Sequence, residues 1–557
     1  MSMKGHQARL LTVSIFFCLI LCILLVRMYD LMIRDRPFLK GQGDARSLRL
    51  VDISAHRGMI VDRQGSPLAV STPMHSVWVN PKAFSADKRQ LAALSKLLNI
   101  QPNRLLHRIN LSKTREFLYL QRQIPPALMK QIADLDIPGI NFQEEFKRYY
   151  PAGESTAQLL GFTNIDDVGL EGLELAYNDW LAGVVGKKKV IKDRLGRIID
   201  ELGVLKEPRA GHMLQLSIDH RIQYVAYHEL QETIDKFGAK SGSVVVLDAQ
   251  TGEILAVANA PSFNPNVRGR YTLDTYRNKA FIDTFEPGSV MKPLSIASAL
   301  DTGKFRPNTI IDTRPGWMSV QGHGVRDVHN YGVLDVTGVL QHSSNVGVTK
   351  MILESPPSQL IDLLTRCGFA QRTDSGYPGE SSGTLIRVKE ASPFVLATLG
   401  FGYGTSITAI QLARSYSIFA NKGKLLPISL IHNQRNGEPT QVLSEKTANE
   451  VLAMMEAVVE TPEGTGRAAR VAGYRVAGKT GTSRIAGKKG YEENRHIASF
   501  VGIAPVSQPR LIVAVIVHEP TRGGYYAAAV AAPLFSKIMG ASLRMLDVPP
   551  DQMTKIS

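Results

Sequence analysis

The sequence predicts an α+β fold in which an antiparallel sheet is flanked by helices. Strand-like hairpins stand near both ends of a long C-terminal region, at 243–258 and 500–517, and a mainly helical section separates them. Strands that enclose central helices in this way are typical of one sheet with helices packed on its faces. An Ala-, Met- and Leu-rich stretch at 527–546 predicts a closing helix.

An apolar run near the N-terminus precedes this fold. It covers 10–26, 17 residues without a charge, which is near the lower limit for a helix that spans a membrane. No small-residue cleavage site follows it, so we favour an uncleaved signal anchor over a cleaved signal peptide or a buried helix of a soluble protein. Lys4 and Arg9 favour a cytoplasmic tail at 1–9, with the remaining chain beyond the membrane.

Composition argues against several functions. The formal net charge is +15, but lysine and arginine are spread along the chain, which suits an anionic cell envelope better than nucleic acid. Cys18 and Cys22 lie in the apolar run, and Cys367 stands alone in the main body. Neither CxxC nor HExxH spacing occurs. We therefore expect no metal, no cofactor and no nucleic-acid partner.

The region 27–210 predicts a turn-rich domain with no chemistry of its own. Residues 57–69 indicate two short strands around an Asp/Arg/Gly turn, and further turns stand at 148–153 and 169–177.

A boundary is expected near Gly211, so the second domain covers 211–557. Past the boundary, the pattern predicts a strand at 214–219 and a helix at 222–237.

The first string that carries chemistry is Ser289-Val290-Met291-Lys292. A loop-like sequence precedes it, so Ser289 is expected at a helix N-terminus, where free N–H groups favour a developing oxyanion. A serine hydroxyl needs a base within hydrogen-bond reach, and Lys292 can serve if burial or nearby positive charge lowers its pKa. The alternative is a serine cap beside a surface lysine. The similar string Ser85–Lys88, in a polar stretch, is interpreted as the start of a helix.

The second string, Ser343-Ser344-Asn345, is a polar turn between apolar runs and suggests polar groups aimed into a cleft. An ordinary serine helix cap explains it equally well.

The third string is Lys479-Thr480-Gly481-Thr482. Its lysine and two hydroxyls can hold a carboxylate, and glycine lets a ligand approach the backbone closely. A similar string at 240–243 is interpreted as the start of a strand.

Only one set of strings runs in the order SxxK, SxN and KTG with wide spacing. The chain therefore resembles the penicillin-recognising serine acyl-transferases, which are the penicillin-binding proteins and the serine β-lactamases. The strings Arg57–Ala69, Arg148–Gly153 and Gly169–Tyr177 resemble the pedestal of class B penicillin-binding proteins, which β-lactamases lack. The resemblance implies a penicillin-binding transpeptidase fold at 211–557 and an elongated, dimerisation-type pedestal at 27–210.

The resemblance also implies a D,D-transpeptidase acting on peptidoglycan stem peptides. Ser289 would attack the carbonyl between two D-alanines, and Lys292 would accept its proton. Ser343 would relay a proton to the leaving D-alanine, and Asn345 would orient Lys292. Lys479 would supply a positive field.

The remaining implied contacts are to the substrate. Thr480 and Thr482 would hold the terminal carboxylate, and the backbone N–H groups of Ser289 and Thr482 would form the oxyanion hole. The expected substrate-binding set also includes Ser344, Gly481, Tyr525 and Tyr526. A β-lactam antibiotic would leave Ser289 acylated.

The chain departs from parts of the family's pattern. It lacks the ExxLN-type string that in class A β-lactamases follows SxN and activates water, which favours transfer over hydrolysis. Division-type relatives often read KSG, where this chain reads KTG. Arg495-His496 stands where relatives often have an aromatic residue, and Ala527-Ala528 where they often have glycines.

Within class B, the compact pedestal looks more like the septal type than the elongation type. This implies a single-pass protein of the bacterial inner membrane with its catalytic domain in the periplasm. The expectation covers both the main division enzyme and a paralogue of it. The implied partners are a membrane glycan polymerase and divisome proteins. A β-lactam sensor and a non-catalytic division scaffold are the alternatives.

Overall fold

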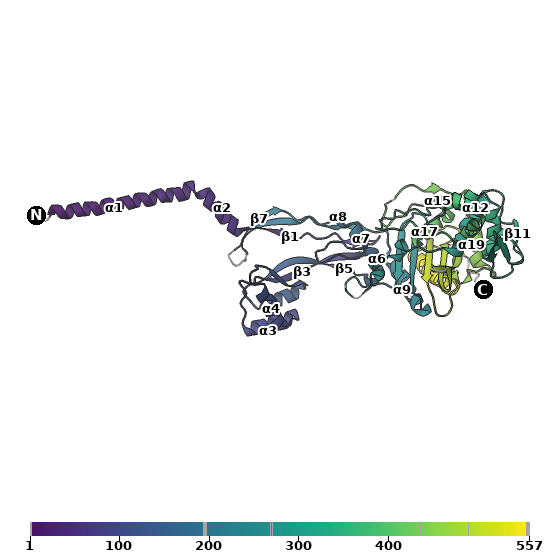
Figure 1. Ribbon diagram of the computed structural model, residues 1–557, viewed down its shortest axis with the longest axis horizontal. Coiled ribbons are helices and arrows are strands. Elements are labelled where there is room, and N and C mark those ends of the chain that lie inside the picture. The colour runs from purple at the N-terminus through teal and green to yellow at the C-terminus, as the bar shows by residue number, and fades with distance from the viewer. Residues whose placement is uncertain are drawn as a thin grey trace. The chain divides into compact units, whose positions relative to one another are not determined.

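A computed structural model describes residues 3–192, 198–267, 269, 271–434, 436–487 and 490–552, and Figure 1 labels its elements. Met1 and Ser2 of the predicted tail lie outside these residues. The chain forms two compact units, and each consists of three segments. The first unit is Met1–His56, Thr72–Lys147 and Gly183–Gly211, and the second is Arg57–Ser71, Arg148–Ala182 and His212–Ser557. The units thus interleave along the chain, and the division into domains 27–210 and 211–557 stays a prediction.

The N-terminal segment is helical. It consists of α1 (Met3–Tyr29), a π-helical turn (Asp30–Arg34) and α2 (Arg36–Ser47). Among the described residues, one stretch, Gln7–Arg34, is long and apolar enough to cross a membrane. A window of 18 residues within it has a mean hydropathy of 2.7, and none of that window is buried.

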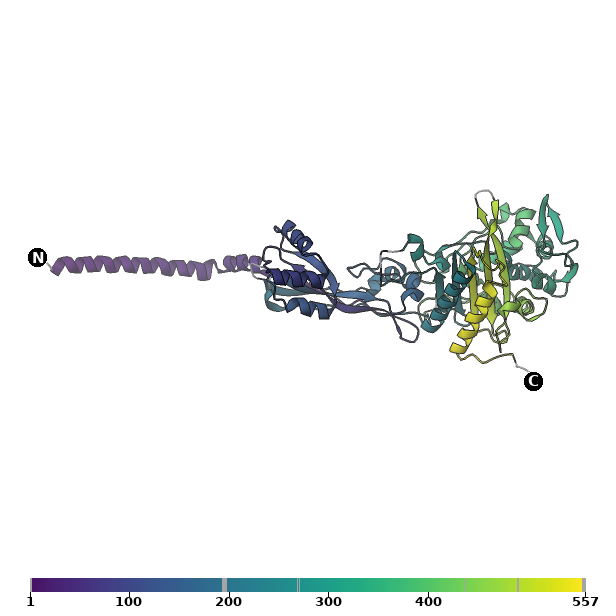
Figure 2. The ribbon, with the colours of Figure 1, turned by 90° about the horizontal axis from the view of Figure 1, so that it is seen from below.

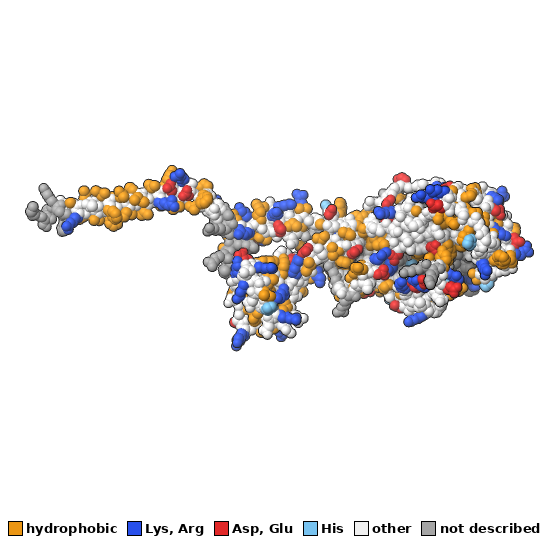
Figure 3. Space-filling model, viewed as in Figure 1, with side chains coloured by type: hydrophobic (Ala, Val, Ile, Leu, Met, Phe, Trp, Pro, Cys, Tyr) orange, Lys and Arg blue, Asp and Glu red, His pale blue; other side chains and the backbone are white. Residues whose placement is uncertain are grey.

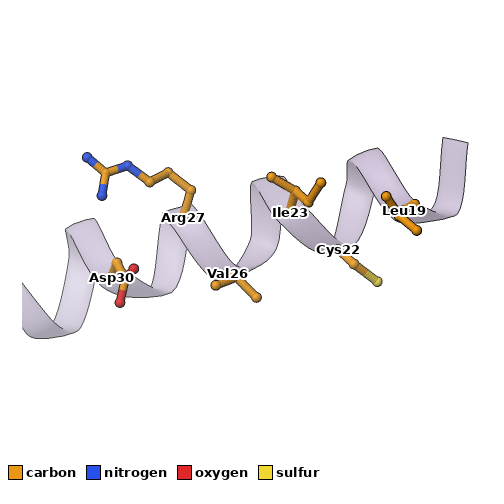
Figure 4. A pocket seen from close by; sticks show the side chains of 6 residues that line it. All are labelled: Leu19, Cys22, Ile23, Val26, Arg27 and Asp30. Carbon is orange, nitrogen blue, oxygen red and sulfur yellow. The ribbon is translucent and has the colours of Figure 1, made fainter. Parts of the chain in front are cut away.

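Hydrophobic side chains cover α1 in Figure 3. Figure 4 shows the uncharged residues Leu19, Cys22, Ile23 and Val26 along this helix, followed by two charged residues, Arg27 and Asp30. Their exposure argues against a helix buried in the core of a soluble protein, because such a helix would cover its apolar side chains.

The rest of the first unit combines two groups of strands with three helices. The strands β1, β6 and β7 form an antiparallel sheet, and β3 pairs with both β4 and β5. The elements are β1 (Leu48–Ile53), β3 (Pro67–Val79), α3 (Lys88–Leu98), α4 (Pro102–Leu111), β4 (Leu118–Ile124), α5 (Pro126–Ala133), β5 (Ile140–Tyr149), β6 (Gly186–Lys192) and β7 (Ile198–Lys206). The helix α3 begins with a capping box between Asp87 and Gln90, so Ser85–Lys88 starts a helix as predicted.

A five-stranded antiparallel sheet, ordered β10-β9-β19-β18-β17, forms the centre of the second unit. Its strands are β9 (Ser241–Asp248), β10 (Ile254–Ala260), β17 (Ala477–Gly487), β18 (Gly490–Ala504) and β19 (Leu511–His518). Both predicted hairpins and the predicted strand start at 240–243 are therefore confirmed. The expected strand at 214–219 is shorter, β8 (Leu214–Gln215), because its partner β2 (Ile60–Val61) pairs with these two residues alone.

Helices cover both faces of this sheet. The helices α9 (His220–Phe237) and α20 (Ala531–Met545) pack on one face, where Figure 2 shows the yellow α20 beside the teal α9. Valines 244 and 246 point to that face, and Val245 and Leu247 point to the other, where α11 and α17 pack. Alternate side chains of one strand thus enter two cores, and the sheet is a rigid support for residues at its edge.

The core on the other face of the sheet contains many helices, of which α12 and α14 carry residues of the first two strings. The helices of this part are α11 (Lys279–Ile282), α12 (Lys292–Asp301), α13 (Val336–Gln341), α14 (Asn345–Leu353), α15 (Pro357–Arg366), α16 (Pro393–Gly400), α17 (Ala409–Ser415), α18 (Ser417–Ala420) and α19 (Glu445–Glu460).

Short elements complete the second unit. They are β2 (Ile60–Val61), α6 (Ala157–Leu160), α7 (Gly172–Ala176), α8 (Asn178–Leu181), α10 (Leu273–Tyr276), β11 (Ile310–Asp312), β12 (Trp317–Val320), β13 (His323–Arg326), β14 (Val333–Asp335), β15 (Lys424–Leu425) and β16 (Thr440–Gln441), with 3-10 turns at Gly153–Thr156, Gly288–Met291, Val388–Glu390 and Arg467–Ala469.

A buried ion cluster holds together two early segments of the second unit. The fully buried carboxylate of Glu174 accepts hydrogen bonds from Nε of Arg57 at 2.8 Å and from Nε of Arg148 at 2.6 Å. Each of these residues comes from one of the turn-rich strings of the first predicted domain. The cluster binds these strings to one another within the second compact unit, and removing Glu174 would leave two buried arginines without this carboxylate.

Candidate active site

Ser289 lies on the 3-10 turn Gly288–Met291, from which α12 continues directly. The expected helix N-terminus is confirmed, with the α-helical part beginning at Lys292. The N–H of Gly288 donates to the carbonyl of Gly402 at 3.0 Å, and the hydroxyl of Tyr416 donates to the carbonyl of Val290 at 2.7 Å. These bonds fix the turn that presents Ser289.

Lys292 is fully buried at the start of α12. Its Nζ donates to Oγ of Ser343 at 3.1 Å, to the carbonyl of Ser343 at 2.5 Å and to Oδ1 of Asn345 at 2.7 Å. Burial lowers the pKa of Lys292 to about 7, and the nearby Asp327 carboxylate acts in the opposite direction. An amine with this pKa can accept a proton at neutral pH.

The second string forms a tight turn in front of α14. Ser343 has a φ of +60°, a strained conformation for a residue with a side chain, and it directs its hydroxyl to both buried lysines. The backbone N–H of Asn345 donates to Oδ1 of Asp327 at 2.5 Å, so Asp327 holds the turn in place.

Ser344 is not among the residues that line the cleft, and its substrate-binding role stays a prediction. It is fully buried at the N-cap of α14, where its Oγ accepts from the N–H of Gly347 and donates to Oδ2 of Asp327 at 2.6 Å. Ser344 is therefore the helix cap that the alternative interpretation of this string expects. Ser343 is not, because successive side chains of the turn point in different directions.

Lys479 is the second buried lysine of the site. It lies on the edge strand β17, and its Nζ donates to Oγ of Ser343 and to the carbonyl of Thr480, both at 3.0 Å. Burial, followed by repulsion from Lys292, lowers the pKa of Lys479 well below its usual value.

The strand alternation separates the other residues of the third string. Thr480 and Thr482 share the face of β17 that borders the cleft, and the hydroxyl of Thr480 donates to Oγ1 of Thr465 at 3.1 Å. Gly481 comes between Thr480 and Thr482 on the opposite face and is not among the residues that line the cleft, so its substrate-binding role stays a prediction. A Cβ there would lie 2.9 Å from Cγ1 of Val290, so glycine lets β17 pack tightly against the nucleophile turn.

These groups border a cleft of about 670 Å³. Of the predicted residues, it is lined by Ser289, Ser343, Asn345, Thr480, Thr482, Tyr525 and Tyr526. The two tyrosine rings stack at 4.5 Å, and His496 stacks on Tyr525 at 4.0 Å. Burial, and then the nearby Arg484, lowers the pKa of His496.

Sequence reasoning missed several residues at this site. The cleft is also lined by Val328, His329, Tyr331, His342, Tyr403, Glu463, Thr465 and Arg484, besides Ala527 and Ala528, which the sequence had singled out. Most lie in loops outside the three strings, where no local pattern marks them. Among the described residues, no group of three or more His, Cys, Asp or Glu side chains could hold a metal ion, and the absence of metal and cofactor stays a prediction.

Comparison with known proteins agrees with this geometry. Residues 242–540 match the penicillin binding protein transpeptidase domain, and residues 52–216 match the penicillin-binding protein dimerisation domain. The probable peptidoglycan D,D-transpeptidase PbpC of Pseudomonas aeruginosa is 42% identical to this chain, covering 99% of it and 98% of the relative. The peptidoglycan D,D-transpeptidase FtsI of Escherichia coli K12 is also 42% identical, covering 96% of this chain and 91% of the relative. The crystal structure of penicillin-binding protein 3 from Mycobacterium tuberculosis, complexed with aztreonam, aligns with a TM-score of 0.70 and 28% identity, covering 90% of this chain and 98% of that one.

Proposed function

This chain belongs to the class B penicillin-binding proteins, and from that premise we propose that it cross-links peptidoglycan stem peptides through an acyl-enzyme at Ser289. One observation supports this proposal most strongly. Two buried lysines, Lys292 and Lys479, converge on the hydroxyl of Ser343 beside the cleft that Ser289 lines. The arrangement supplies a proton acceptor and a proton relay next to a nucleophile.

In the proposed acylation, the hydroxyl oxygen of Ser289 attacks the carbonyl carbon between two D-alanines. The neutral amine of Lys292 takes the hydroxyl proton, while the N–H groups of Ser289 and Thr482 stabilise the negative carbonyl oxygen. The carbon–nitrogen bond then breaks, and the leaving amine receives a proton through Ser343. Asn345 holds the amine of Lys292 in place through its Oδ1.

The hydroxyls of Thr480 and Thr482 are proposed to bind the terminal carboxylate of the donor. Lys479 adds positive charge next to this position. In the second half-reaction, an amine of a neighbouring stem peptide attacks the acyl carbon, and Ser289 is released. A β-lactam would acylate the same serine, and the aztreonam complex of the Mycobacterium tuberculosis relative supports this expectation.

The cellular setting is part of the proposal. The helix Gln7–Arg34 would anchor the chain in the inner membrane, with the catalytic unit in the periplasm. The likeness to FtsI supports a role in septal cell-wall synthesis, and a membrane glycan polymerase and divisome proteins are the proposed partners. A non-catalytic scaffold is less well supported, since burying two lysines costs free energy and brings a scaffold no benefit.

Fluorescent penicillin labelling of the detergent-solubilised full-length protein tests the nucleophile. We expect Ser289→Ala to abolish covalent labelling. Ser85→Ala, in the similar string of the first unit, is the matched control and should label normally. Covalent labelling of the Ser289→Ala protein at the normal level would show that the nucleophile is assigned wrongly. Release of D-alanine from a pentapeptide donor then tests the substrate class.

A further inference from the structure

The loop between α19 and β17 presents one carboxylate to the cleft. Glu463 is exposed and lines the cleft together with Thr465. Among the described residues that line the cleft, Glu463 is the single acidic one. Arg484 also lines the cleft and carries a positive charge.

Hydrogen bonds hold this loop on both sides of the projecting carboxylate. Nε2 of Gln341 donates to Oγ1 of Thr461 at 2.6 Å, and Oγ1 of Thr465 accepts from Thr480 at 3.1 Å. A Cβ on Gly464 would lie 2.2 Å from the carbonyl of Val458, so the loop packs tightly against the end of α19. The backbone of Glu463 is thus placed by its neighbours, while its side chain stays free to meet a ligand.

The proposed transfer reaction needs an amine at this end of the cleft. The attacking nitrogen must occupy the position that the leaving nitrogen has just vacated, next to Ser343, because acyl transfer follows the reverse path of acylation. The turn that carries Ser343 follows Gln341, which binds the Glu463 loop through Thr461. The SxN turn and this loop thus border the same cleft, and the acceptor is proposed to enter between them.

A primary amine of a stem peptide arrives as a cation, since its pKa is about 10 in water. Arg484, which also lines the cleft, repels such a cation, and a carboxylate at the entrance offsets this repulsion. We propose that Glu463 attracts and positions the cationic amine of the acceptor peptide. This inference rests on the proposed function and names the residue that selects its second substrate.

The ammonium group first loses one proton to solvent. The lone pair of the neutral amine forms a bond to the acyl carbon, and the ester bond to Oγ of Ser289 breaks. The second proton leaves the nitrogen and passes through Ser343 to Oγ of Ser289, which regenerates the hydroxyl. Glu463 takes no part in these bonds and acts through charge alone.

The test separates the two half-reactions in the full-length protein. A D-alanyl thioester serves as donor, and the acceptors are D-alaninamide, a cation at pH 7, and methanol, which is neutral. For Glu463→Gln we expect the KM for D-alaninamide to rise about tenfold with kcat little changed, while methanol transfer and penicillin acylation of Ser289 stay normal. Glu463→Asp should restore most of the affinity, and Glu463→Lys should raise the KM further.

Two additional measurements distinguish an effect of the Glu463 charge from a disturbance of the folded structure. The KM difference between wild type and Glu463→Gln should shrink as salt rises, because exposed charges are screened. Glu438→Gln, an exposed glutamate that does not line the cleft, should behave as wild type. An unchanged KM for the amine, or an equal loss with methanol, would overturn the role of Glu463. If wild-type protein is not acylated at all, the proposed function itself fails.

Discussion

Lys292 and Lys479 bring their side-chain nitrogens to the same oxygen atom. The Nζ of Lys292 lies 3.1 Å from Oγ of Ser343, and the Nζ of Lys479 lies 3.0 Å from it. One lysine starts α12 and the other lies on the edge strand β17, so the helical part of the second unit and its sheet meet at this hydroxyl. Burial lowers the pKa of both amines, and their mutual repulsion disfavours a doubly protonated pair.

Replacing Lys292 by alanine should slow acylation by fluorescent penicillin by about a thousandfold, the usual effect of losing a general base. The folded protein should persist, because the substitution removes a buried amine and leaves no buried charge behind. Stopped-flow labelling and a thermal melt measure the two effects. Lys304→Ala, an exposed lysine paired with Glu354, is the control. Acylation of the Lys292→Ala protein at the normal rate would show that Lys292 is not the base.

The acylation rate should rise with pH through about 7 and level off above it. Burial lowers the pKa of Lys292 to about 7, and only its neutral form accepts the proton of Ser289. Labelling rates between pH 5.5 and 9 measure this midpoint. A rate that stays flat across this range would contradict the assignment.

The free energy of unfolding should also rise with pH, as the acylation rate does. The pKa of Lys292 is lower in the folded state than its ordinary value of 10.5, so the unfolded chain binds more protons between about pH 7 and 10.5. The contribution of this group to the free energy of unfolding therefore rises with pH across that window. Denaturant titrations should show a weaker rise for Lys292→Ala than for wild type. An identical pH dependence in the two proteins would argue against a lowered pKa.

Asp327→Asn should move the midpoint of the acylation profile to lower pH. The negative charge of Asp327 raises the pKa of Lys292, so its removal lets burial lower that pKa further. The amide oxygen can still accept from the N–H groups of Asn345 and Val346, and the stability loss should be about 1–3 kcal/mol. The exposed Asp312→Asn provides the comparison. A midpoint that rises or stays fixed would be the contrary result.

Gly402→Ala should disturb the nucleophile turn. Its φ is +87°, and a Cβ there would lie 2.1 Å from the carbonyl oxygen of Gly288. We expect a loss of about 3 kcal/mol in the free energy of unfolding and slower acylation of Ser289. Gly404→Ala has a similar φ of +75° but no heavy atom within 4 Å of the new Cβ. It should lose only about 1 kcal/mol, and equal losses in the two variants would show that the contact with Gly288 is unimportant.

Local patterns predicted much of the second unit. The hairpins, the helix α9 and the closing helix α20 follow from apolar spacing and turn residues, which act over a few positions. The three strings were found because the reaction needs particular side chains at short spacing. Their assembly in one cleft was predicted only through the resemblance.

The sequence could not predict which side of each element a polar residue faces. Ser343 and Ser344 are neighbours, yet one borders the cleft and the other caps α14 in the interior. Glu463 lies in an ordinary polar loop of the sequence, and only the folded structure shows that it lines the cleft. The interleaving of the two units was missed because Glu174 meets Arg57 and Arg148 across long separations in the chain.

The sequence by itself determined the class of this protein, its apolar helix and the residues that can do chemistry, because these depend on composition, order and short spacing. Only the tertiary structure decided that Lys292 is buried near Asp327 and that Oγ of Ser343 accepts hydrogen bonds from two lysines. It also decided that Ser344 caps a helix and that Gly481 lets β17 pack closely against the nucleophile turn. A pKa and a hydrogen-bond partner are set by atoms that surround a side chain in space, and for these residues those atoms come from distant parts of the chain.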